Sequence, residues 1–118
     1  MFSNNSRHYH VIARVLLMVC AAFLVVAVLS SAAAKSRTHT VTLRGMKNAP
    51  ATLVVKAGDT VVWKNDDVVP HTATDRGKSF DSGNIEPGGS WSYVANRKGT
   101  YSYYCAYHPN TRGKLIVR

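Results

Sequence analysis

The sequence predicts an all-β fold, an antiparallel β-sandwich, for the part of the chain after residue 34. Several short segments there alternate apolar and polar residues with the two-residue period of a half-buried strand. Turn-forming residues separate these segments at intervals of about 8–12 residues, which is typical of sandwiches. No segment after residue 35 has the 3.6-residue period of an amphipathic helix.

The first three expected strands are residues 40–44, 53–56 and 60–64. They are rich in β-branched and aromatic residues, which suit a pleated and half-buried surface. Ala57-Gly58-Asp59 forms the turn between the second strand and the third. Asn65-Asp66-Asp67 ends the third strand, and we expect this polar run to be a solvated turn.

A polar stretch at residues 75–78 predicts a loop, and the next four residues, 79–82, predict a short edge strand. Glu86-Pro87-Gly88-Gly89 is a strong turn, because Pro fixes one backbone angle and Gly adopts conformations that other residues avoid. This part of the chain is therefore expected to hold few strand residues.

The last three expected strands are residues 91–95, 100–105 and 115–117. Aromatic residues alternate with smaller ones in the first two, and three consecutive aliphatic residues form the last. Residues 96–99 end in Gly and form the turn between the first two of these strands. About seven or eight strands are expected in total.

The first 34 residues have the pattern of a secretory signal peptide. Arg7 and Arg14 precede an uninterrupted apolar stretch at residues 15–29, and small residues follow it up to Ala34. The apolar stretch is short for a membrane span, which needs about 20 residues, although an uncleaved anchor is the alternative. We expect cleavage after Ala34, which leaves residues 35–118 as a single exported domain without stable membrane association.

Basic residues outnumber acidic ones in this domain. Residues 35–118 carry 13 Lys and Arg against 6 acids, and the basic residues are scattered along the chain. Scattered positive charge favours electrostatic steering toward an acidic partner over nucleic-acid recognition, so no nucleic-acid binding is expected. A solvated surface that keeps the protein soluble explains the same charge equally well.

Cys105 is the only cysteine of residues 35–118, because Cys20 lies in the signal peptide. An exported free thiol is readily oxidised, which favours a metal-bound sulfur. His108 follows Cys105 in Tyr-Cys-Ala-Tyr-His, and His71 follows a proline far upstream. Two imidazoles and one thiolate are the ligand set of a blue-copper centre, usually completed by a weak axial Met.

The order of several short motifs resembles the cupredoxins, the family of type 1 blue-copper proteins, and most closely its amicyanin and pseudoazurin group. The likeness covers essentially the whole of residues 35–118. Its motifs are Met46-Lys47-Asn48-Ala49-Pro50, Val55-Lys56-Ala57-Gly58-Asp59-Thr60-Val61-Val62-Trp63, Val69-Pro70-His71-Thr72, Phe80-Asp81-Ser82-Gly83, Gly99-Thr100-Tyr101-Ser102-Tyr103-Tyr104-Cys105, His108-Pro109 and Arg112-Gly113-Lys114.

This resemblance implies a Greek-key sandwich with one copper ion, cycling between Cu(I) and Cu(II), bound by His71, Cys105 and His108. It implies a periplasmic and monomeric one-electron carrier that serves a redox partner protein and is not an enzyme. The alternatives are a copper storage, delivery or sensing module, and a metal-free interaction domain. Cleavage after Ser36 is a further alternative, which would bring His39 to the third position, where a histidine can bind Cu(II).

The departure from the family lies at Thr111, because the short-loop group has its axial Met at this position. A threonine hydroxyl is a poor ligand for Cu(I). Met46, expected on a strand near the metal-binding end, is one substitute. The axial position is therefore left open between Thr111, Met46, water and no ligand.

Overall fold

The structure is a computed structural model that describes residues 12, 14 and 32–118. Residues 32–118 contain eight strands and no helix, which confirms the all-β prediction. The strands are β1 (Thr38–Arg44), β2 (Lys47–Ala49), β3 (Thr52–Val55), β4 (Asp59–Asn65), β5 (Thr74–Asp75), β6 (Ser90–Ala95), β7 (Gly99–Tyr104) and β8 (Arg112–Val117).

Residues Lys35–Arg118 form one compact unit. The expected signal peptide, including Cys20, lies outside the described residues except for a few positions. Within the described part of the chain, no helix has the length and apolar character needed to span a membrane.

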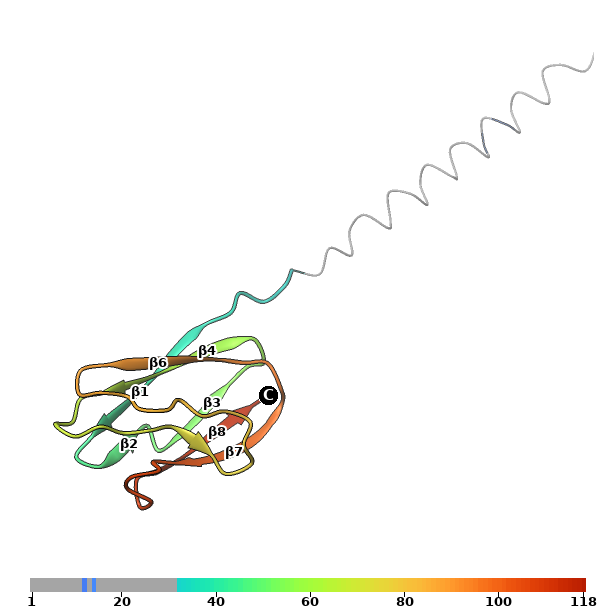
Figure 1. Ribbon diagram of the computed structural model, residues 1–118. Coiled ribbons are helices and arrows are strands. Elements are labelled where there is room, and N and C mark those ends of the chain that lie inside the picture. The colour runs from blue at the N-terminus through green and yellow to red at the C-terminus, as the bar shows by residue number, and fades with distance from the viewer. Residues whose placement is uncertain (1–11, 13, 15–31) are drawn as a thin grey trace, which may run out of the picture. The chain divides into compact units, whose positions relative to one another are not determined.

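The eight strands form two four-stranded sheets that face each other as a sandwich (Figure 1). The first sheet has the order β2-β1-β4-β6, and the second has the order β3-β8-β7-β5. Strand β5 therefore lies at one edge of the second sheet, beside β7. This places the segment before β5 close to the end of β7, where Cys105 follows.

The two sheets are mixed, which corrects the expectation of a purely antiparallel sandwich. Strand β1 pairs with β4 in parallel, and β3 pairs with β8 in parallel, while the other pairings are antiparallel. The reason is the path of the chain. Between β1 and β4 it passes through β2 in one sheet and β3 in the other, and it then returns beside β1 in the same direction.

The predicted edge strand at residues 79–82 is wrong in position. Only Asp81 pairs there, in an isolated bridge with Thr74, and the edge strand is β5 itself. The chain turns back tightly after β5, because the Asp75 carbonyl and carboxylate accept the N–H groups of Lys78 and Ser79. After this turn the chain reaches β6 with isolated bridges only, at Asp81 and Ile85.

The core between the sheets is built around Trp63 of β4, whose side chain is fully buried. The Trp63 ring lies 5.3 Å from that of Tyr103 in an edge-on arrangement and 5.5 Å from that of Phe80. Aliphatic residues of both sheets complete the core: Val41, Leu43, Val55, Val61, Ile85, Leu115 and Val117. Because Tyr103 is anchored in this core, the end of β7 and the residue that follows it, Cys105, are held on a rigid base.

Candidate metal centre

The structure brings His71, Cys105 and His108 together, although His71 is distant from the other two in sequence. One ligand atom from each of the three residues lies within 4.8 Å of the others. The Cys105 sulfur lies 3.5 Å from Nδ1 of His108, and the two imidazole rings are 5.1 Å apart. His71 and Cys105 are fully buried, whereas His108 is half-buried.

Buried Asn65, at the end of β4, shapes the segment that carries His71. Its side-chain amide donates to the carbonyls of Val69 and Ile85, at 2.8 and 2.9 Å, and its side-chain oxygen accepts the N–H of Asp67 at 2.9 Å. His71 and Ile85 also exchange both backbone hydrogen bonds. The backbone of His71 is therefore fixed from two sides.

Asp67 orients the His71 ring. Its carboxylate accepts a hydrogen bond from Nε2 of His71 at 2.8 Å. Burial alone would raise the pKa of Asp67. Hydrogen bonds from the Met46 N–H, the His71 ring and the Gly45 N–H outweigh burial, so the pKa lies below its ordinary value of 3.8. An ionised Asp67 therefore accepts the hydrogen bond from Nε2 of His71.

The second ring nitrogen of His71, Nδ1, is buried and has no hydrogen-bond partner among the described residues. Buried polar atoms in proteins are nearly always paired, so an orphaned imidazole nitrogen beside a thiol needs an explanation. A metal ion bound at this nitrogen provides one, because ligating histidines commonly donate their other N–H to a carboxylate. The donor set of one sulfur and two imidazole nitrogens fits copper.

A tight loop holds Cys105 and His108. The Cys105 N–H donates to the carbonyl of Thr111 at 2.9 Å, and the Thr111 N–H donates to the carbonyl of His108 at 2.8 Å. Thr72, next to His71, donates its N–H to the Cys105 sulfur at 3.3 Å, and its hydroxyl accepts the Ala106 N–H at 2.8 Å. The loop is therefore attached to the segment of the third ligand.

Thr111 is buried, with 2% of its surface exposed, and its hydroxyl donates to the carbonyl of Met46 at 2.9 Å. Met46 lies in the turn between β1 and β2 with a φ of 61°, not on a strand as expected. Its side chain is 40% exposed. His39 is not part of the group of close ligand atoms, and its ring bonds Asp59 at 2.9 Å.

Sequence reasoning missed Asp67 and Thr72. The run Asn65-Asp66-Asp67 was expected to be solvated, which fits Asp66, because that residue pairs with surface Arg44 and Lys64. Asp67 instead faces the centre. The signal available was a carboxylate four residues before a ligand histidine, since the second nitrogen of such a histidine usually needs an acceptor.

The family model of the cupredoxin-like domain matches residues 15–117. The chain belongs to the cupredoxin family. Cupredoxins bind one copper ion, and the described residues include the His-Cys-His group that this cofactor requires. The predicted membership of this family is confirmed.

Amicyanin from Paracoccus versutus is 35% identical over 77 residues, covering 61% of this chain and 58% of the relative. Chloroplastic plastocyanin from Fritillaria agrestis is 35% identical over 83 residues, covering 58% of this chain and 50% of the relative. The chain thus spans less than two thirds of the length of these curated relatives.

Two solved structures share the fold. An oxidised point mutant of amicyanin has a TM-score of 0.64 at 31% identity, with 67% of this chain and 80% of the other covered. The purple cupredoxin from Nitrosopumilus maritimus has a TM-score of 0.63 at 30% identity, with 67% and 98% covered. The likeness to amicyanin is therefore seen in both sequence and structure.

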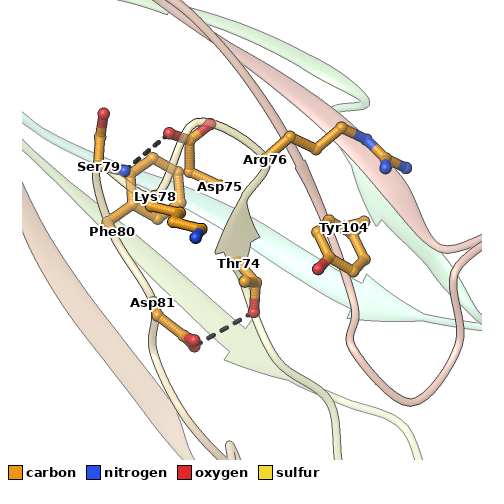
Figure 2. A pocket seen from close by; sticks show the side chains of 8 residues that line it. All are labelled: Thr74, Asp75, Arg76, Lys78, Ser79, Phe80, Asp81 and Tyr104. Carbon is orange, nitrogen blue, oxygen red and sulfur yellow. Dashed lines mark hydrogen bonds between the residues drawn. The ribbon is translucent and has the colours of Figure 1, made fainter.

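A surface hollow of about 580 Å³ lies beside β5 (Figure 2), and none of the three ligand residues lines it. The Arg76 guanidinium lies 4.6 Å from the centre of the Tyr104 ring on one side of it. The residues that line the hollow are Thr74, Asp75, Arg76, Lys78, Ser79, Phe80, Asp81 and Tyr104. Two acids and two bases line it, so neither charge sign dominates, and it does not indicate a site for a strongly charged ligand.

Proposed function

We propose that the chain is an exported one-electron carrier with a type 1-like copper site formed by His71, Cys105 and His108. The observation that carries this proposal is the buried and unpaired Nδ1 of His71, close to the Cys105 sulfur and the His108 ring. Bound copper would supply a one-electron couple. The thiolate suits Cu(I), and the imidazoles suit both oxidation states.

The protein would contribute rigidity to this function. A fast carrier needs ligands that stay in place when the charge of the centre changes. Hydrogen bonds donated by Asn65 and Thr72 and accepted by Asp67, together with the backbone hydrogen bonds of the Cys105–His108 loop, hold the ligands without help from a metal. This arrangement favours small ligand movement during electron transfer.

The edge of His108 is the proposed point of electron exchange, because the other two ligands are fully buried. Exposed apolar residues lie in the turn between β1 and β2, in the segment before His71 and in the loop of Cys105 and His108: Met46, Val68 and Tyr107. Apolar exposed groups rimmed by polar residues are typical of docking sites. The excess of basic residues would steer a redox partner with an acidic surface toward the protein.

We further propose that residues 1–34 direct export to the periplasm and are cleaved, and that residues 35–118 act as a monomer without enzymatic activity. The sequence pattern of a basic region, an apolar stretch and small residues supports the export proposal.

A second candidate function is copper storage or delivery with the same three ligands. Thr111 favours it, because the chain has no Met at the axial position of the sequence motif. The two candidates differ in the visible spectrum and in the rate of electron self-exchange. A carrier shows the intense absorption of a thiolate–Cu(II) bond and exchanges electrons rapidly.

The test is reconstitution of purified wild-type protein with Cu(II), followed by metal analysis, a visible spectrum and a self-exchange measurement by NMR. One bound copper with strong colour and fast exchange supports the carrier. One bound copper without strong colour, or with slow exchange, supports storage or delivery. No bound copper refutes both and leaves an interaction domain.

Matched histidine variants test the ligand assignment. His39 and His71 each bond an aspartate through Nε2, but only His71 has a buried and unpaired Nδ1. We expect His71→Asn and Cys105→Ser to abolish the colour, and His39→Asn to keep the copper stoichiometry and spectrum of the wild type. Loss of colour in His39→Asn alone would contradict the assignment.

A further inference from the structure

Thr111 occupies the sequence position of an axial ligand, yet its hydroxyl is already engaged. The side chain is 2% exposed, and Oγ1 donates its single proton to the Met46 carbonyl at 2.9 Å. This bond sets the direction of the hydroxyl and occupies one lone pair of the carbonyl. A neutral alcohol is also a hard ligand that suits a thiolate-bound copper poorly.

The Met46 carbonyl belongs to a turn that Asp67 holds. The N–H groups of Gly45 and Met46 donate to the two carboxylate oxygens of Asp67 at 2.6 and 3.0 Å. The oxygen that accepts from Met46 also accepts Nε2 of His71 at 2.8 Å. The turn between β1 and β2 is thus bonded to the same carboxylate that orients the first ligand.

Thr111 bonds the backbones of the other two ligands directly. Its carbonyl accepts the Cys105 N–H, and its N–H donates to the His108 carbonyl. Hydrogen bonds therefore lead from the loop of Cys105 and His108 through Thr111, the backbone of Met46 and Asp67 to His71. Thr72 links the same two segments a second time, through its N–H to the sulfur. Together these contacts form a closed ring of hydrogen-bonded residues that links all three ligand residues.

We propose that Thr111 is a positioning residue and not a copper ligand. Its hydroxyl locks the loop of Cys105 and His108 to the turn held by Asp67, so that the distances among the three ligand atoms are set before any metal binds. This inference rests on the proposed copper function and refines it. In this proposal, the residue at the axial sequence position aligns the other ligands and does not bind copper.

The experiment compares Thr111→Val with Thr111→Ser, measuring the thermal midpoint of the metal-free protein, the Cu(II) dissociation constant, and the visible and EPR spectra. Valine has the shape of threonine without the hydroxyl, whereas serine keeps the hydroxyl. Thr60→Val is the matched control, because this half-buried threonine stands at the start of β4, at the end of that strand opposite to His71.

We expect Thr111→Val to lower the metal-free midpoint by about 4–8 °C, the shift that corresponds to one lost hydrogen bond in a domain of this size. The same variant should weaken copper binding about 10-fold, as is usual when a residue that supports a ligand is removed, and should change the spectra. Thr111→Ser should keep the affinity and spectra of the wild type. Thr60→Val should change none of the copper measurements.

Each of three other results overturns the inference. A changed spectrum with an unchanged metal-free midpoint means that the hydroxyl acts on the metal directly. A lowered midpoint with unchanged affinity and spectrum means that the bond serves folding alone. If Thr111→Ser changes the copper affinity and the spectra as much as Thr111→Val does, the hydroxyl is not the group that positions the ligands.

A double variant tests the ring as a unit. Asp67→Asn replaces a carboxylate that accepts several N–H groups by an amide that donates on one side. If Thr111 acts through Asp67, the combined loss of copper affinity is smaller than the product of the two single losses. Independent losses overturn the proposed route. A wild type that binds no copper refutes the copper function itself, whereas a copper-binding wild type whose affinity and spectra are matched by Thr111→Val refutes only this inference.

Discussion

Replacing Gly113 by alanine should destabilise the protein through a clash inside the second sheet. Gly113 of β8 stands directly opposite Tyr103 of β7 in the strand register. A Cβ at position 113 would lie well inside van der Waals contact of Cζ and the hydroxyl oxygen of Tyr103. Tyr103 cannot swing outward easily, because it is 2% exposed and packs edge-on against Trp63 at 5.3 Å.

The expected cost follows from this geometry. Forcing an extra methyl group into a well-packed core costs about 1–3 kcal/mol. For a domain of this size, each kcal/mol lowers the thermal midpoint by about 4–8 °C, so a cost of about 2 kcal/mol corresponds to a fall of about 8–16 °C. The assay is thermal unfolding of the metal-free protein followed by far-UV circular dichroism.

A second substitution distinguishes this clash from a change in backbone flexibility. Tyr103→Leu removes the ring atoms that the new methyl group would meet, at its own cost in burial. In the Tyr103→Leu background, Gly113→Ala should therefore lower the midpoint much less than it does in the wild type. An equal penalty in both backgrounds, or a Gly113→Ala midpoint within about 2 °C of the wild type, would refute the steric reasoning.

Acid should destabilise the protein through Asp59, whose pKa falls from 3.8 to about 2 because it accepts hydrogen bonds from the Arg37 N–H, the His39 ring and the Lys56 N–H. A pKa that is lower in the folded state than in the unfolded state stabilises the fold at pH values above the unfolded pKa, so this contribution is lost between about pH 4 and pH 2. Urea midpoints of the wild type and of Asp59→Asn, measured across this pH range, test the prediction. Identical pH profiles of the two proteins would contradict it. Copper should raise the thermal midpoint, since free copper at about 100 times its dissociation constant adds about 2.7 kcal/mol. A chelator should reverse this rise and Cys105→Ser should abolish it, so a rise that persists in Cys105→Ser would place the copper elsewhere.

The sequence predicted the longer strands and the three ligand candidates, because both depend on local patterns. Strands such as β4 and β7 are long enough to show their period. Strands β2 and β5, with three and two residues, are too short to show any period. The parallel pairings depend on where the chain crosses between sheets, and turn residues do not specify this.

The two neighbours Asp66 and Asp67 show why the surroundings of the ligands were harder to predict. Both stand in one polar run, yet Asp66 pairs with surface cations and Asp67 binds the backbone of the turn at Gly45 and Met46. These backbone partners of Asp67 lie more than 20 residues earlier in the chain, and such contacts appear only when the sheets have assembled. The one local signal that distinguishes the two residues is the position of Asp67 four residues before His71.

The difference in burial among the three ligands also bears on the lifetime of the bound metal. His71 and Cys105 are sealed in the protein, whereas His108 is half-buried in a loop held by its backbone bonds to Cys105 and Thr111. Because His108 is the only one of the three with solvent exposure, copper bound by these residues would be reached from the side of His108. On the proposed function, the loop of residues 105–111 would then influence metal exchange as well as electron exchange. A substitution in these seven residues would therefore be expected to change both rates.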